Sequence, residues 1–177
     1  MKKKSMALLA AFVVVVSLVG ALAEQSNEPS HMSGPITPVG DLTPAKTPLY
    51  PVGTRIIIKT DHMEGMQGAL GVVSGAYDTI LYAVDYTDED GKAVINHRWV
   101  IAEEIANGAG NVLKIGDTVS LGTGHMGGHG GVGKSAIIVQ ICRGPAYMVD
   151  YDPVDGGERV VNHQWVSEFE IEPAVSN

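Results

Sequence analysis

The sequence is poor in cysteine, in aromatic residues and in positive charge, and each shortage excludes a class of protein. With Cys142 alone, neither an intramolecular disulfide nor a zinc site of four thiolates can form. Lys and Arg number 12 against 20 Asp and Glu, a formal charge of −8, so no basic surplus exists to meet nucleic-acid phosphates. Aromatic residues make up 6% of the chain while glycines number 22, which indicates a turn-rich β protein.

Residues 1–23 are predicted to be a secretory signal peptide. Three lysines precede an uncharged apolar run over residues 6–22, and Ala21-Leu22-Ala23 fits a cleavage site. The alternative is an uncleaved membrane anchor. Cleavage removes three lysines and no acid, so the formal charge changes from −8 to −11. We therefore expect a protein that is secreted or held at the extracellular face of the envelope and attracts cations.

Residues 24–51 are predicted to be a proline-rich linker. Six of the nine prolines fall in this segment, which has no apolar periodicity and contains the pair His31-Met32. Because proline fixes φ and removes a hydrogen-bond donor, an extended and partly disordered lead is expected.

The remaining chain is an internal repeat, with one copy over residues 52–110 and the second over 111–177. Val52–Ile56 aligns with Ile115–Val119 at an offset of 63, and Asn96–Val100 aligns with Asn162–Val166 at an offset of 66. Units this short bury too little surface to be stable alone, so the copies are expected to pack together.

Both copies are predicted to be β structure. Short β-branched runs separated by Gly, Asp and Pro indicate strands, and acidic segments after the last strand indicate short helical turns. The predicted fold is all-β, with two tandem small SH3-like β-barrel repeats packed together. A single twisted antiparallel sheet built from both copies is the alternative. The predicted strands cover residues 54–58, 79–86, 93–100, 117–121 and 159–166, with another after residue 68, and the turns cover 103–105 and 168–171.

Histidine and methionine are clustered in glycine-rich loops after the first strand of each copy. Beyond residue 23 there are six His and five Met, and eight of these eleven lie in three short clusters. Thioether sulfur suits Cu(I), and imidazole suits both oxidation states of copper. The candidate copper ligands are His62, Met63 and Met66 in the first copy and His125, Met126 and His129 in the second. The alternative is that each His-Met pair caps a turn and packs one thioether.

A second shared motif, Asn-His-x-Trp-Val, contains both tryptophans, Trp99 and Trp165. Strand alternation would place His97, Trp99 and Ile101 on one face. The tryptophans are expected to anchor the core. His97 and His163 are either structural or additional copper ligands.

The remaining polar motifs give no enzyme signature. Asp85 and Asp150 are expected to belong to a solvated acidic rim, since the acidic turns lack the full set of positions of a calcium loop. The sequence has no nucleophile elbow, phosphate-binding loop or His-Glu-x-x-His helix, so we expect no catalytic activity.

Taken together, these motifs resemble a known family. The segments Lys59–Ala69, Ala76–Thr79, Val84–Thr87 and Asn96–Val100 resemble the YdhK-like family of bacterial envelope proteins, over about residues 42–172. That family carries two copies of one domain of unknown function and includes the copper-tolerance lipoprotein CopL. The resemblance implies an extracytoplasmic copper-binding protein without catalysis. Many members carry a lipid-anchor cysteine after the signal peptide, which this chain lacks.

The functional hypothesis is a monomeric protein that buffers or sequesters copper, Cu(I) above all, through its His/Met loops. Its partner would be the copper ion, with possible envelope association and no nucleic acid. The alternative hypothesis is a non-metal cell-wall or adhesion module with structural His-Met turns.

Overall fold

The computed structural model describes residues 37–88, 90–122 and 133–174. These residues belong to one compact unit, His31–Asn177. The described residues contain strands and two short 3-10 helices, η1 (Ala102–Glu104) and η2 (Glu168–Glu170). The strands are β1 (Arg55–Ile58), β2 (Leu70–Tyr77), β3 (Ile80–Thr87), β4 (Ala93–Ile101), β5 (Thr118–Ser120), β6 (Ser135–Arg143), β7 (Ala146–Asp152), β8 (Val160–Ser167) and β9 (Ile171–Pro173). The predicted all-β class is confirmed, and both predicted helical turns are present.

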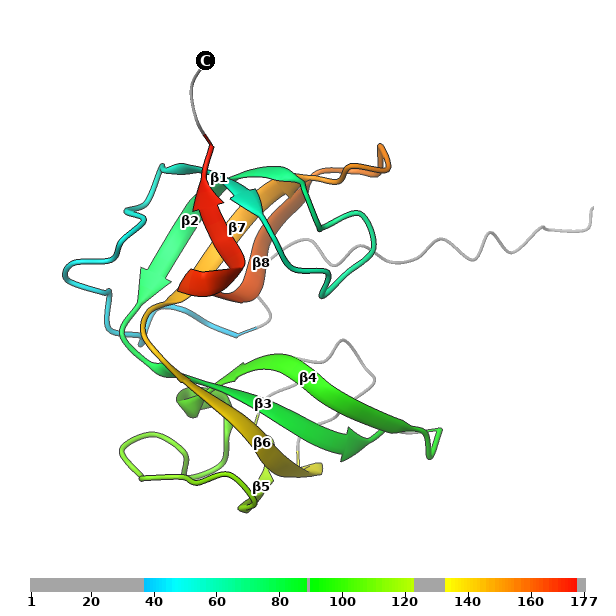
Figure 1. The fold of residues 1–177 in the computed structure, drawn as a ribbon. Coiled ribbons are helices and arrows are strands. Elements are labelled where there is room, and N and C mark those ends of the chain that lie inside the picture. The colour runs from blue at the N-terminus through cyan, green and yellow to red at the C-terminus, as the bar shows by residue number, and fades with distance from the viewer. Residues whose placement is uncertain (1–36, 89, 123–132, 175–177) are drawn as a thin grey trace, which may run out of the picture. The chain divides into compact units, whose positions relative to one another are not determined.

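The strands form two antiparallel sheets, and each sheet contains strands from both repeats. The first sheet has the order β8-β7-β2-β1-β9 and the second has the order β4-β3-β6-β5. In Figure 1 the cyan and green strands of the first repeat lie beside the orange and red strands of the second repeat within the first sheet. Neither repeat builds a sheet of its own, in contrast to the predicted barrel for each repeat. Closure of the sheets into barrels is not shown by the strand pairing.

The short links from β2 to β3 and from β6 to β7 explain why each repeat contributes strands to both sheets. Only Asp78 and Thr79 separate β2 from β3, and neither residue has a positive φ. A two-residue hairpin of type I′ or II′ requires positive φ in its turn, so β2 and β3 cannot fold back on each other in that way. The chain instead continues extended from the first sheet into the second. Gly144 and Pro145 form the matching link between β6 and β7, where the fixed φ of proline excludes a type I′ turn.

Three clusters of buried apolar side chains form the core. One contains residues of the first sheet, including Ile56 and Val149, together with Met66 from the loop between β1 and β2. Another contains residues of the second sheet, including Tyr82 and Ile138. The third is shared by both sheets, because it holds Leu81, Ala83, Trp99 and Ile101 together with Ala146, Met148 and Trp165. Both tryptophans therefore anchor the core, as the sequence predicted, and they do so where the two sheets meet.

The described part of the proline-rich segment, residues 37–51, is attached to the sheets. Ala45 donates its backbone N–H to the carbonyl of Ala76 at 2.9 Å, and Pro44 forms an isolated bridge with Tyr77. Leu42 is buried in the cluster shared by the two sheets. This part of the predicted linker thus packs against the fold.

Across the described residues, no helix has both the length and the apolar character needed to cross a membrane.

Candidate functional site

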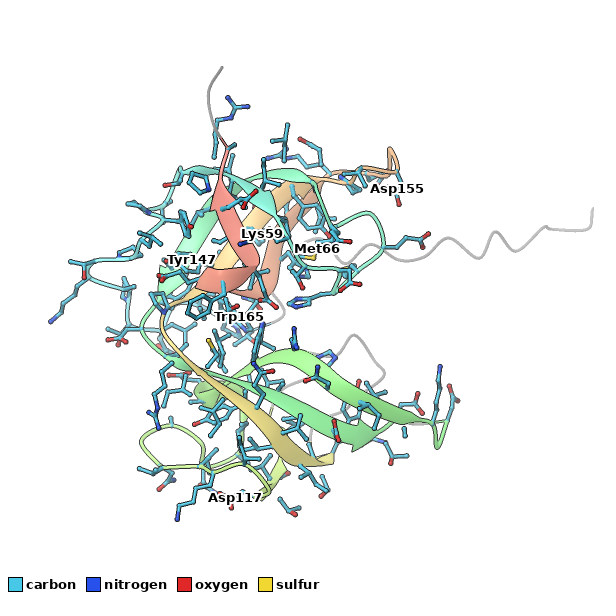
Figure 2. All side chains as sticks on the ribbon, in the orientation of Figure 1. Lys59, Met66, Asp117, Tyr147, Asp155 and Trp165 are labelled. Carbon is cyan, nitrogen blue, oxygen red and sulfur yellow. The ribbon has the colours of Figure 1, made fainter. Side chains whose placement is uncertain are left out.

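The loop between β1 and β2 turns its two methionines toward the core. Met66 is fully buried within the first cluster (Figure 2), and Met63 packs against the same cluster while partly exposed. The sulfur of Met63 lies 3.9 Å from the hydroxyl of Tyr151 on β7. The loop is closed by backbone hydrogen bonds, including one from Gly68 to Ile58 at 2.7 Å. Gly68 adopts a positive φ of 84°, which glycine reaches without steric cost.

His62, on the same loop, lies between a carboxylate and a second histidine. Its Nε2 atom is 2.9 Å from Oε1 of Glu170. Its ring centre is 6.4 Å from that of His163 on β8, and the His163 ring meets Tyr151 edge-on at 5.8 Å. Met63 and His163 therefore both contact Tyr151, and His62 lies beside His163. Nδ1 of His62 is buried and has no hydrogen-bond partner within the part of the chain that the structure describes.

A β-bulge in each Asn-His-x-Trp-Val segment separates the histidine from the tryptophan. On β4, Val100 pairs with Tyr82 but His97 pairs with Val84, so one extra residue lies on β4. An inserted residue reverses the alternation of side chains. His97 accordingly contacts Tyr86 edge-on at 5.7 Å, whereas Trp99 belongs to the cluster shared by both sheets. The prediction that His97, Trp99 and Ile101 share one face is therefore wrong for His97.

His62 and His97 line the same cavity, although they lie beside different sheets. The cavity has a volume of about 450 Å³ and is bordered by the β1–β2 loop and by β4. Its lining residues are Thr60, Asp61, His62, Val94, Ile95, Asn96, His97 and Arg98. Most of these side chains are polar, so the cavity suits a small polar ligand or an ion with its water more than an apolar ligand.

Two buried glutamates, Glu104 and Glu170, connect the sheets. The indole N–H of Trp99 on β4 donates to Glu170 at 2.6 Å, and that of Trp165 on β8 donates to Glu104 at 3.0 Å. Each tryptophan thus bonds to the glutamate that follows the other one in the sequence. Buried carboxylates are costly unless they are fully hydrogen-bonded, so these pairs hold the two sheets in one arrangement.

Glu170 is ionised despite its burial. Burial alone would raise the pKa of its carboxyl group, but the hydrogen bonds from His62, Ser167 and Trp99 outweigh that effect and lower the pKa to about 2. Arg98 adds a positive charge 3.7 Å from Oε1. The carboxylate is therefore a negative acceptor at neutral pH.

The residues around Glu104 differ from those around Glu170. Thr37 of the lead segment donates its hydroxyl to Oε1 of Glu104, and its backbone N–H donates to Gln164 at 2.9 Å. Gln164 occupies the position that Arg98 holds in the first repeat. Glu104 therefore accepts from a threonine that is itself hydrogen-bonded to an amide side chain, whereas a histidine and a guanidinium lie beside Glu170.

Sequence reasoning assigned no role to either glutamate. Glu104 and Glu170 are 66 residues apart, the same separation as the two Asn-His-x-Trp-Val motifs. This shared spacing marks them as equivalent positions of the two repeats. Asp85 and Asp150 also have structural partners, because each accepts the backbone N–H of the asparagine that begins the motif, at 2.6 and 2.8 Å.

Several predicted ligands lie outside the described residues. His125, Met126 and His129 belong to the segment 123–132, and the pair His31-Met32 also falls outside the description. Cys142 is half-buried beside the shared cluster, and burial, with the charges of Glu170 and Glu168, raises the pKa of its thiol. Where the structure describes the chain, no three His, Cys, Asp or Glu side chains are grouped as a metal site. A ligand set in this region would therefore need methionine or a rearranged loop.

Comparison with known proteins gives the family. The family described as "Protein of unknown function (DUF1541)" matches residues 52–102 and 115–168, one match for each repeat. The chain belongs to the DUF1541 family. A relative, "Uncharacterized protein YdhK" of Bacillus subtilis (strain 168), is 43% identical over 145 residues, which cover 81% of this chain and 69% of the relative.

Solved structures of DUF1541 proteins have the same fold. The crystal structure of YdhK from Bacillus subtilis at 2.00 Å resolution matches with a TM-score of 0.74 and 43% identity, covering 81% of this chain and 97% of that one. The solution NMR structure of the YdhK C-terminal domain matches with a TM-score of 0.64 and 44% identity, covering 70% of this chain and 92% of that one. The YdhK-like resemblance is thereby confirmed. The link to the copper-tolerance protein CopL stays a prediction.

Proposed function

We propose that this DUF1541 protein binds copper, Cu(I) above all, outside the cytoplasm and buffers it as cargo. The observation that carries the proposal is the proximity of two histidines, His62 and His163, with ring centres 6.4 Å apart, to Tyr151 and Met63, since His163 and Met63 both contact Tyr151. We propose that each ring turns one nitrogen toward a single ion bound between them. A thioether beside them favours Cu(I) over harder cations.

The surroundings of this cluster support a cation as the ligand. Glu170 supplies a negative charge at His62, and the chain carries 20 acidic against 12 basic residues. Acidic surfaces raise the local concentration of cations. Export after cleavage of residues 1–23 would place the protein where thioether and imidazole ligands resist oxidation better than thiolates do. A buffering role requires no catalytic group, and we propose none.

Met66 and His97 have weaker claims as ligands in this arrangement. Met66 is fully buried among aliphatic and aromatic side chains, and His97 contacts Tyr86 and the 450 Å³ cavity. Their assignment as ligands stays a prediction, as does that of His125, Met126 and His129 in the second repeat.

The decisive experiment is an anaerobic titration of residues 24–177 with Cu(I) against a competing chelator. We expect the double variant His62→Ala, His163→Ala to bind one copper fewer per chain, or the same number with at least tenfold weaker affinity at one site. Met66→Leu keeps the side-chain volume and serves as the matched control for a core thioether. Unchanged stoichiometry and affinity in the double variant would overturn the proposed site.

The cavity beside β4 favours a second candidate, a cell-wall or adhesion module that binds a polar polymer. Its lining includes Asp61, Asn96 and Arg98, which can hydrogen-bond hydroxyl and carboxylate groups. This candidate predicts sedimentation of the protein with purified cell-wall polymer, reduced by Arg98→Ala and unaffected by Met63→Leu. Failure of the wild-type protein to sediment would exclude it.

A further inference from the structure

We infer that Glu170 is a positioning residue that fixes His62 as its Nε2–H tautomer and so presents Nδ1 as the atom that binds the metal. The identity of the ligand as copper rests on the proposed function. The positioning of His62 follows from contacts of the metal-free chain.

The orientation of the Glu170 carboxylate is fixed by donors on one of its oxygens. Oε2 accepts from the indole of Trp99 at 2.6 Å and from the backbone N–H and the hydroxyl of Ser167, both at 2.8 Å. These three donors leave Oε1 directed toward His62 at 2.9 Å, with Arg98 farther away at 3.7 Å.

The tautomer of His62 follows from the chemistry of the carboxylate. An ionised carboxylate has acceptors only, so the Nε2 atom that faces it must carry the proton. In neutral imidazole the other nitrogen is then an acceptor with a free lone pair. The Nδ1 atom is that acceptor, and among the described residues nothing donates to it although it is buried.

A buried acceptor without a donor is destabilising. A metal ion bound to the lone pair of Nδ1 would remove this cost. Metal-binding histidines commonly donate their second ring N–H to a carboxylate, which fixes the tautomer and raises the basicity of the ligating nitrogen. Glu170, His62 and the lone pair of Nδ1 have this arrangement. His163, on β8, has its ring centre 6.4 Å away, so a second imidazole is within reach of the same ion.

Glu104 provides a natural comparison within the same chain. It has the equivalent place in the other repeat and a tryptophan donor of its own, at 3.0 Å. It accepts from Thr37 and from the backbone of Ile101. A substitution at Glu104 therefore disturbs a comparable buried network without touching His62.

The first test is the tautomer of His62 in the metal-free chain. Long-range ¹⁵N–¹H correlation spectra distinguish the tautomers, and His62→Gln assigns the signal by its disappearance. We expect Nε2–H in the wild-type protein. This measurement needs no variant of Glu170, so poor folding of such a variant does not affect it. A predominant Nδ1–H tautomer would overturn the inference.

The second test compares Glu170→Gln with Glu104→Gln. In Glu170→Gln, the amide oxygen is expected to face the three donors at the Oε2 position, which turns the amide N–H₂ toward His62. His62 must then accept at Nε2, so its tautomer should change to Nδ1–H and its Cu(I) affinity should fall about 10–100-fold. Glu104→Gln should leave the tautomer of His62 unchanged.

The results of these tests distinguish a failure of the positioning of His62 by Glu170 from a failure of copper binding. Equal Cu(I) affinities for Glu170→Gln and Glu104→Gln, in a protein whose wild-type form binds copper, would overturn the inference alone. A wild-type chain that binds no copper but shows the Nε2–H tautomer would overturn the proposed function and support the positioning of His62 by Glu170.

Discussion

The sequence allowed two interpretations of Met66, and they predict different effects of its substitution. As a candidate ligand it would be exposed to solvent and metal, and as a core residue it would fill space. The structure places it fully buried in the cluster of the first sheet. Met66→Ala should lower the free energy of unfolding by about 2–5 kcal/mol because a cavity remains. Urea denaturation monitored by tryptophan fluorescence measures this.

The control for this prediction is Met66→Leu, which conserves most of the volume. Its expected cost is below about 1.5 kcal/mol. Equal losses of stability for the alanine and leucine variants would contradict a packing role and indicate that the sulfur itself matters.

Glu170 makes stability depend on acidity. Its pKa is about 2 in the folded protein against a reference value of 4.5, so the folded state binds its proton less readily than the unfolded chain. The stabilisation is therefore fully present above pH 4.5 and is lost as the pH falls toward 2, by roughly 3 kcal/mol at most. Unfolding free energies measured between pH 5 and pH 2 should fall more steeply for the wild-type protein than for Glu170→Gln. Parallel pH profiles would contradict this assignment.

The role of a single residue was predictable from the sequence where it depends on residues close to it in the chain. The glycine-rich His-Met loop and the tryptophan anchors were recognised because their neighbours in the sequence define them. Glu170 was not, because its partners His62 and Trp99 are 108 and 71 residues away. Nothing in the acidic turn itself distinguishes a buried acceptor from a solvated charge.

At the scale of elements, the contact between β2 and β7 joins the two repeats within one sheet. Gly71 on β2 permits this contact, since a Cβ atom there would lie 2.6 Å from the carbonyl oxygen of Asp150 and 3.2 Å from Cβ of Tyr151. The close atom is backbone, so the strands would have to separate. Gly71→Ala should destabilise the protein by about 1–3 kcal/mol, measured by thermal or urea unfolding.

Gly40→Ala is the matched control for the strand contact. A Cβ atom at Gly40 would meet no atom within 4 Å. We expect a change within about 0.5 kcal/mol of the wild-type protein. A comparable loss of stability in both variants would show that the spacing of β2 and β7 is not the cause.

The strands were predictable as elements, but the face of each side chain was not. Runs of Ile, Val and Tyr identified β1, β3, β4 and β8 closely. The bulge on β4 reversed the alternation, so His97 and Trp99 point to different clusters. A bulge depends on pairing with a neighbouring strand, which local periodicity does not report.

At the scale of the whole molecule, the exchange of strands makes each repeat dependent on the other. Sheet one combines β1 and β2 with β7 to β9, and sheet two combines β3 and β4 with β5 and β6. Residues 52–110 expressed alone should therefore lack a folded monomer. They should be unfolded or form dimers in which two copies complete each other's sheets, as measured by circular dichroism and light scattering.

Mixing residues 37–110 with residues 111–177 is the complementary experiment. The two fragments should associate and recover the sheet signal, since together they supply both sets of strands. A stable, folded monomer of residues 52–110 alone would show that the exchange seen in the structure is not required for folding.

The sequence alone determined the all-β class, the duplication and the position of the His-Met loops, because these features depend on local composition and on spacing along one chain. Only the tertiary structure decided that strands are exchanged between the repeats, that the tryptophans bond to glutamates of the other repeat and that His62 lies between Glu170 and His163. The physical reason is that these contacts join groups far apart in sequence. These contacts arise from burial and from the pairing of segments that are distant in sequence. The residue pattern of a single segment predicts neither. The shortage of cysteine that excluded disulfides and thiolate sites leaves histidine, methionine and carboxylate as the side chains of the proposed metal site.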